Sequence, residues 1–169
     1  MATGYVYDPI FLRHTYPNHP ESAQRLETII EQLKTAGLWQ TLEQTPARPA
    51  TFDELARAHQ PGYIRRIEAA CRQGNGYLNP DTYVTSASYR AATVAAGSLI
   101  DLTLAVAAGR LQNGFALVRP PGHHATQTQP MGFCLFGNVA LAALAALNAG
   151  LERVAIIDFD VHHGNGTQA

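Results

Sequence analysis

Short apolar segments alternate with helical segments along this chain, and this alternation constrains the fold more than any other feature. Residues 115–118 (FALV) and 154–158 (VAIID) are apolar on both faces, as expected for strands buried from both sides. Residues 86–109 are small and apolar almost all round, which is typical of a buried helix. Residues 138–150 form a second such segment, and Gly150 closes it. The alternation predicts an α/β structure in which helices cover a mainly parallel sheet.

The amino-terminal part of the chain continues this pattern. Residues 20–37 have apolar side chains at helical spacing, with Pro20 near the start and Gly37 past the end. Thr51 and Glu54 form a capping-box pattern, which predicts the start of another helix. Further predicted elements are a first strand at 3–8, a short helix at 62–72 and an exposed loop at 74–84.

Composition and charge narrow the function classes. The 169 residues, 46% hydrophobic and 15% charged, suit one globular unit with its own core. The net charge of −1 gives no basic surface for direct nucleic-acid binding or for a membrane. The first residues lack a cationic stretch followed by a long apolar run, so no signal peptide is expected. Cys71 and Cys134 suit reduced thiols, and the expected location is cytoplasmic.

Four of the seven histidines form two adjacent pairs, each shortly after a predicted strand. His123 and His124 follow the first strand through a Pro-Pro-Gly turn, and His162 and His163 follow the second. Ligands in open α/β sheets bind at the carboxyl ends of the strands. Both pairs are therefore expected at one edge of the sheet.

The second pair belongs to a candidate metal site. In an extended segment, residues two apart point the same way, so Asp158, Asp160 and His162 share one side. Asp160 and His162 offer one oxygen and one nitrogen to a single ion, and zinc accepts both. The alternative is that these polar groups end a strand in a solvated loop. Carboxylates beside a buried strand would each lose several kcal/mol of hydration, roughly, which favours a compensating cation.

The first pair is a candidate for proton transfer. Pro120, Pro121 and Gly122 exclude a helix there, and imidazole titrates near neutrality. The alternative is one histidine satisfied in the core and one exposed to solvent. Residues 132–134 (GFC) and the predicted helix start at Asn138 follow closely, which indicates a shaped wall around the pair.

Three motifs resemble the signature blocks of the zinc-dependent histone deacetylase family, closest to its class II and bacterial members. They are RPPGHHA, GFCLFGNVA and AIIDFDVHHGNGTQ, and NHPESAQRL and NPDTYVTSASYRAA are similar to the family's amino-terminal blocks. The resemblance covers essentially the whole chain. It implies a three-layer, arginase-like α/β fold with a mainly parallel sheet and hydrolysis of acyl amides of lysine or of polyamines. Because the family's catalytic domain is about twice this length, residues 1–169 would form its amino-terminal portion, with the fold incomplete.

The resemblance also implies roles for individual residues. Asp160 and His162 would be two of three zinc ligands, and His123 and His124 the catalytic pair. Asp158 would stand behind His123 and share a structural potassium site with main-chain oxygens of Asp160 and His162. The candidate substrate-binding residues are the tunnel walls Gly132 and Phe133, the rim residue Asp81, and Arg25 as a buried arginine near the foot of the tunnel.

Two departures from the family pattern stand out. Asn165 occupies the position at which many class I members have an aspartate that supports the second histidine, although class II-like members also have asparagine. The asparagine gives His124 no charge, so His124 is the expected general base and His123, beside Asp158, the expected imidazolium. The third zinc ligand and the transition-state tyrosine are expected beyond Ala169. Strands from that second half would separate the strands that precede the two histidine pairs, leaving a gap in the sheet.

Other functions remain open at this point. One is a ureohydrolase of the same fold with two manganese ions, whose motif resembles D-x-H-x-D, whereas Gly164 stands at the closing position here. Another is a non-catalytic module that binds acyl-lysine or a partner. The substrate could be an acetylated protein, an acetylated polyamine or another small amide, and the oligomeric state is not predicted.

Overall fold

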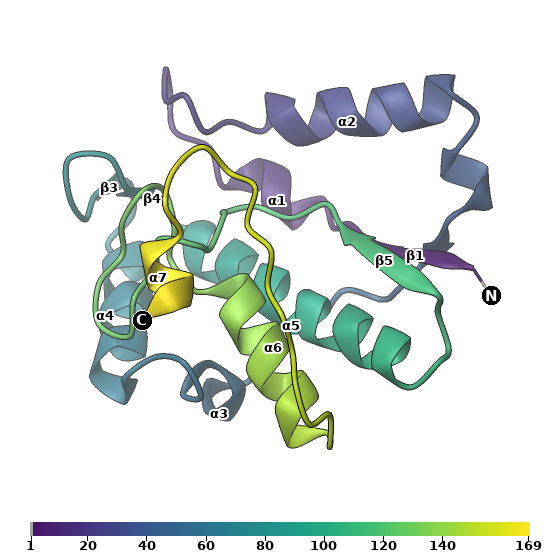
Figure 1. Cartoon of the computed structure of the whole chain (residues 1–169). Coiled ribbons are helices and arrows are strands. Elements are labelled where there is room, and N and C mark those ends of the chain that lie inside the picture. The colour runs from purple at the N-terminus through teal and green to yellow at the C-terminus, as the bar shows by residue number, and fades with distance from the viewer. Residues whose placement is uncertain (1) are drawn as a thin grey trace.

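The computed structural model of the chain describes residues 2–169 and contains a small parallel sheet. Its strand order is β2-β1-β5 (Figure 1). The central strand, β1 (Thr3–Val6), pairs in parallel with β2 (Glu43–Gln44) on one side and with β5 (Asn113–Ala116) on the other. The predicted α/β class with a parallel sheet is confirmed.

Helices cover both faces of this sheet. Tyr5 of β1 packs in a cluster with Leu26 and Ile30 of α2 (Gln24–Thr35), whereas Val6 packs with Leu102 of α5 (Ser88–Ala107). Figure 1 shows α2 on one side of the strands and α5 on the other. Successive strand residues point to opposite faces, so β1 contributes to both layers.

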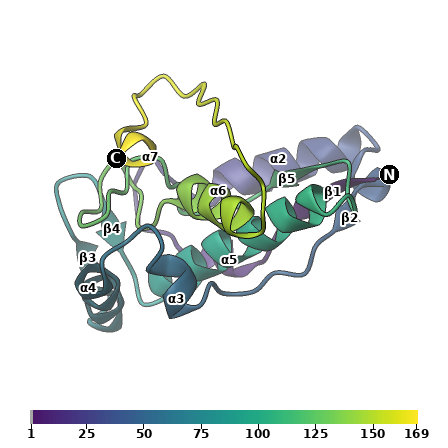
Figure 2. The ribbon, with the colours of Figure 1, turned by 60° about the horizontal axis from the view of Figure 1, so that its bottom comes forward.

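The two apolar helices predicted from the sequence form the centre of the chain. α5 packs along α6 (Asn138–Asn148), as Figures 1 and 2 both show. One helix within residues 2–169, α5, is long and apolar enough to cross a membrane, but 61% of its most apolar stretch is buried, and core helices pass the same test. Cys71 and Cys134 are free and buried, and the cytoplasmic location stays a prediction.

The remaining elements, apart from the 12-residue helix α4 (Pro61–Arg72), are short. Thr51 forms the predicted capping box with Glu54 at the start of α3 (Phe52–Leu55). The segment expected to be a loop at 74–84 contains a two-stranded antiparallel ribbon. The helices and strands not yet described are α1 (Ile10–Arg13), η1 (Trp39–Thr41), α3 (Phe52–Leu55), α4 (Pro61–Arg72), β3 (Gly76–Tyr77), β4 (Tyr83–Val84) and α7 (Asn165–Gln168).

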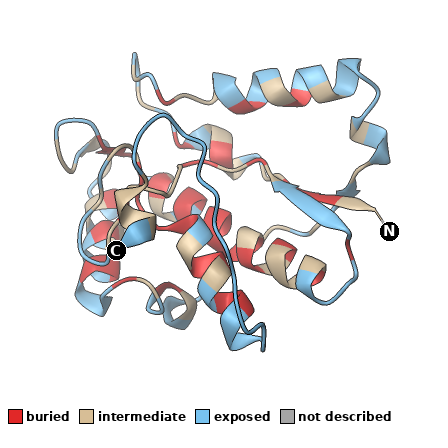
Figure 3. Ribbon diagram, in the orientation of Figure 1, coloured by how far each residue is buried: buried red, intermediate tan, exposed pale blue. Residues whose placement is uncertain are grey.

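Two predictions about strands are wrong. The strand predicted at 115–118 lies at 113–116, and its Phe115 is 54% exposed. Residues 154–158 form no strand, and the exposed segment from 151 to 163 includes Ile157, which is 87% exposed (Figure 3). A strand needs a neighbour for its N–H and C=O groups, and no strand within residues 2–169 pairs with this segment. The carboxylates are therefore not beside a buried strand, and the desolvation argument for a cation fails here.

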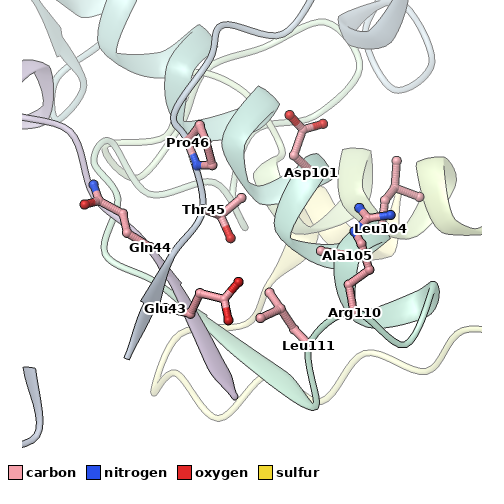
Figure 4. Close-up of a pocket in the computed structure, with 9 residues that line it drawn as sticks. All are labelled: Glu43, Gln44, Thr45, Pro46, Asp101, Leu104, Ala105, Arg110 and Leu111. Atoms are coloured by element: carbon pink, nitrogen blue, oxygen red, sulfur yellow. The ribbon is translucent and has the colours of Figure 1, made fainter. Parts of the chain in front are cut away.

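A groove of about 480 Å³ lies between β2 with its following residues and the carboxyl-terminal end of α5 (Figure 4). Its charged side chains are Glu43, Asp101 and Arg110. None of the predicted site residues lines it. The candidate catalytic and metal-binding residues lie elsewhere, on the loop after β5 and around α7.

Candidate active site

His162 of the second pair lies near His124 of the first, although loops rather than two strands bring them together. The His123 carbonyl accepts the backbone N–H groups of Gly166 and Thr167 at 2.9 and 3.1 Å. The His124 and His162 ring centroids are 6.0 Å apart. A Cβ on Gly166 would collide with the backbone of Ala125, so glycine allows this close approach. The segment around α7 is thereby held against the first histidine pair.

His123 has a carboxylate partner. Its Nδ1 lies 2.9 Å from Asp158 Oδ2, and Asp158 Oδ1 accepts the N–H of Asp160 at 3.1 Å. The hydrogen bond from His123 is the main cause that lowers the pKa of Asp158 below its ordinary value. Asp158 therefore stands behind His123 as predicted, and it is ionised at neutral pH.

His124 has a neutral partner. Its Nδ1 lies 2.7 Å from Asn165 Oδ1, and the two histidine rings are 4.0 Å apart between centroids. An amide oxygen only accepts hydrogen bonds, so Nδ1 carries the proton and Nε2 has the lone pair in the neutral ring. This tautomer leaves Nε2 able to accept a proton.

Asp160 and His162 lie side by side at the surface. Asp160 Oδ1 is 3.0 Å from His162 Nδ1 and accepts the His162 backbone N–H at 2.8 Å. That backbone N–H is the first cause of the lowered pKa of Asp160, followed by the His162 ring. Among residues 2–169 no group of three His, Cys, Asp or Glu side chains could hold a metal ion. The pair supplies one oxygen and one nitrogen donor, and no third donor joins it here.

Gly132 lies against the ring of His124, and the next residue, Phe133, continues this wall. Both have positive φ angles, 53° and 69°, a region that costs a non-glycine residue about 1–2 kcal/mol. A Cβ on Gly132 would collide with the His124 ring. Glycine is therefore needed for the contact between this wall and the second histidine.

Asp81 is connected to this wall through Thr82, a residue that sequence reasoning missed. Thr82 Oγ1 donates to Asp81 Oδ1 at 2.7 Å and accepts the Phe133 N–H at 3.1 Å. His19, also missed, has its Nε2 3.0 Å from the Asp81 carbonyl oxygen, and its ring stands edge-on to Phe133 at 4.8 Å. The sequence feature that could have indicated His19 is its position in the NHPES motif.

The expectation of a buried Arg25 is wrong for this structure. The Arg25 side chain is 46% exposed and donates to the Val118 carbonyl at 3.1 Å. The fully buried arginine is Arg119, with Glu21 as its partner. Arg119 lies in the RPPGHHA motif, but a partner 98 positions away leaves no local sequence pattern.

His59 is a further residue that sequence reasoning missed. It is 3% exposed, its Nδ1 donates to the Thr126 carbonyl at 2.9 Å, and its Nε2 accepts the Gly137 N–H at 2.9 Å. Burial lowers its pKa from the ordinary value. The neutral ring thus bridges the loop after the histidine pair to the start of α6.

Comparison with known proteins relates this chain to one family. The model of the histone deacetylase domain matches residues 19–169. Histone deacetylase 15 of Arabidopsis thaliana is 46% identical over 151 residues, which cover 89% of this chain and 27% of that protein. The histone deacetylase-like amidohydrolase of Pseudomonas aeruginosa is 41% identical over 167 residues, or 98% of this chain and 43% of that protein.

A solved structure relates the chain to the same family. The crystal structure of the HDA15 HD domain superimposes with a TM-score of 0.96 at 41% identity, covering 99% of this chain and 50% of that one. The chain thus spans half or less of the length of these relatives. The predicted arginase- and deacetylase-like fold is confirmed by this match. The chain belongs to the histone deacetylase family.

Proposed function

We propose that this chain supplies the histidine pair and two metal ligands of a zinc-dependent hydrolase that removes acetyl groups from lysine side chains or similar amines. The observation that carries the proposal is the pair of hydrogen bonds behind the histidines. His123 is backed by the carboxylate of Asp158, and His124 by the amide of Asn165. Two adjacent imidazoles with different partners suit one acid and one base.

Asp160 and His162 would hold the zinc ion. Their oxygen and nitrogen donors are 3.0 Å apart and fit two of the three protein ligands that catalytic zinc normally has. When bound, zinc polarises the acetyl carbonyl and lowers the pKa of water. Asp158, with main-chain oxygens of Asp160 and His162, stays the predicted potassium site.

The chain's own residues would move the protons and place the substrate. His124 Nε2, with its lone pair free, takes a proton from the attacking water, while His123 holds a proton beside Asp158 for the leaving amine. Acid–base help of this kind contributes typically about 10²–10⁴-fold. Gly132 and Phe133 would line the acyl-lysine tunnel. The role of Asp81 at the rim stays a prediction, whereas Arg25 is not proposed for the foot of the tunnel, because its side chain is 46% exposed.

The substrate could be an acetylated protein or an acetylated polyamine. The two-manganese alternative is less favourable, because Gly164 offers no ligand where that motif has a carboxylate. The non-catalytic alternative predicts binding without turnover. No direct contact with nucleic acid or membrane is proposed.

The test uses the full-length protein that carries this chain. Bound metal is measured by mass spectrometry, and turnover is compared on an acetyl-lysine peptide and on an acetylated polyamine. His162→Ala should lower zinc content and abolish turnover. His163→Ala is the matched control, because the ring of His163 bonds Gln168 instead of the candidate ligands. Full turnover of zinc-free protein would exclude zinc dependence, and binding without turnover would favour the non-catalytic module.

A further inference from the structure

A buried ion pair lies at the base of the histidine loop. Arg119 is fully buried, and its Nε and Nη2 donate to the two carboxylate oxygens of Glu21 at 2.7 and 2.6 Å. Its Nη1 donates to the Phe11 carbonyl at 2.8 Å. The Glu21 carboxylate also lies 3.5 Å from Arg25 and 3.8 Å from His14. Two parallel hydrogen bonds fix the orientation of the guanidinium as well as its position.

This ion pair anchors the turn that carries the catalytic histidines. Arg119 directly precedes Pro120, and the turn reaches His123 within four residues. On the other side, Asn138 donates from Nδ2 to the Pro120 carbonyl at 3.1 Å. The turn is therefore held between Glu21, which comes from the loop before α2, and the first residue of α6.

Glu21 is also connected to the substrate rim through its own loop. Its backbone N–H donates to Nδ1 of His19 at 3.1 Å. The other ring nitrogen of His19 bonds the Asp81 carbonyl, and the ring stands against Phe133. The loop that carries Glu21 thus contacts the rim and the tunnel wall.

A second connection runs through the neighbouring strand. The Tyr83 hydroxyl accepts from Arg119 Nη2 at 3.3 Å. Thr82, the preceding residue, accepts the Phe133 N–H. Arg119 and Glu21 therefore both contact Tyr83 directly, whereas Phe133 is reached only through the neighbouring residues Thr82 and His19.

We propose that Glu21 is a positioning residue for the histidine pair, acting through its ion pair with Arg119. This inference rests on the proposed deacetylase function. Glu21 touches neither substrate nor the reacting atoms. It sets where His123 and His124 stand relative to the tunnel, so its loss lowers kcat with little change in KM. A misplacement of about 1 Å in such a site costs on the order of 10²-fold in rate.

The experiment compares two variants of Glu21 in the full-length protein. Glu21→Gln keeps the shape of the side chain but removes its charge and one acceptor. Glu21→Asp keeps the charge but is too short to bond both guanidinium nitrogens. For both variants, kcat on an acetyl-lysine peptide should fall about tenfold or more, while KM stays within about twofold. If Glu21→Gln does not fold, the kcat and KM of Glu21→Asp test the proposal.

Glu54→Gln is the matched control. Glu54 also forms a bidentate pair with an arginine, through Nη1 and Nη2 of Arg48 at 2.7 and 2.8 Å, and it contacts no histidine. This variant should lower the melting temperature and leave kcat unchanged. A loss of kcat in Glu54→Gln equal to that in Glu21→Gln would mean that lower stability explains both effects, and would overturn the proposal.

A spectroscopic readout separates this inference from the proposed function. The imidazole ¹H–¹⁵N resonances of His123 and His124 should shift in Glu21→Gln and Glu21→Asp, but not in Glu54→Gln. Resonances that superimpose on those of the wild type would overturn the inference, whatever the rates. A wild-type protein that hydrolyses no acetyl amide would refute the proposed function, and the resonances would still test the role of Glu21.

Discussion

Replacing His59 with phenylalanine removes one buried and one partly buried hydrogen bond while keeping an aromatic ring of similar size. In the wild type, His59 connects the Thr126 carbonyl to the Gly137 N–H, both at 2.9 Å. Thr126 follows the histidine pair closely, and Gly137 is the residue before α6. The variant therefore breaks the connection between the loop that follows the histidine pair and α6, the helix that packs on α5.

The size of the effect follows from the burial of the two partners. Gly137 is buried, so its N–H loses a partner without gaining water, which costs about 1–3 kcal/mol. Thr126 is half-buried and its carbonyl can regain water, so about 1 kcal/mol is lost there. His59→Phe should lower the free energy of unfolding by about 2–4 kcal/mol, a large share of the roughly 5–15 kcal/mol typical of domains.

The pH dependence gives this prediction a second test. Burial lowers the pKa of His59 in the folded protein below the ordinary value of 6.5. The stability that the neutral ring contributes is therefore fully present above pH 6.5. It is lost as pH falls toward the folded pKa, by up to about 1.4 kcal/mol per pH unit. The difference between wild type and His59→Phe should shrink between pH 7.5 and pH 5.5.

Urea denaturation of the full-length protein at both pH values measures this difference. His163→Phe is the control, because His163 is exposed and should change stability little at either pH. Two results would refute the reasoning: a loss below about 0.5 kcal/mol at pH 7.5, or a difference that stays constant with pH.

Three further predictions concern the site and the chain. Gly132→Ala should push its Cβ into the His124 ring and lower kcat by about 10²–10⁴-fold in steady-state kinetics; wild-type kcat would contradict this. Asn165→Asp should favour a charged His124 and move the acidic limb of the pH–rate profile upward; an unchanged profile would remove Asn165 from the mechanism. The 169-residue chain alone should be poorly soluble or molten, bind zinc weakly and show no turnover in a peptide assay; clear zinc-dependent turnover would disprove this.

The helices could be predicted because their signals are local. The apolar pattern at 86–109 and 138–150 lies within each helix, and α5 and α6 lie where that pattern placed them. The capping box of Thr51 and Glu54 spans only four residues. A strand depends on its neighbour, so 154–158 remained without partners despite a strong strand pattern.

The buried polar pairs could not be found from the sequence for a related reason. Arg119 and Glu21 are 98 residues apart, and His59 is 67 residues from Thr126. Arginine and glutamate are mostly exposed in proteins and histidine is intermediate, so the sequence does not indicate burial of these residues unless the partner is known. Arg25 is the opposite case. It lies in a recognisable sequence motif, but the motif alone does not determine whether its side chain is buried, and here the side chain is 46% exposed.

The two-residue spacing of the candidate metal ligands has a different physical cause from the one that the sequence predicts. Asp158, Asp160 and His162 were grouped because alternate residues of a strand share a side, yet they form no strand. Instead, each aspartate accepts the backbone N–H two residues on, from Asp160 at 3.1 Å and from His162 at 2.8 Å. Such turns between side chain and backbone are typical of aspartate. These turns keep Asp158, Asp160 and His162 close together without a neighbouring strand. The hydrogen bonds from the backbone N–H groups of Gly166 and Thr167 to the His123 carbonyl then hold this segment against the histidine pair. The candidate ligands are therefore placed by local turns and by the loop after β5, which explains why they approach the histidines although residues 154–158 lie outside the sheet.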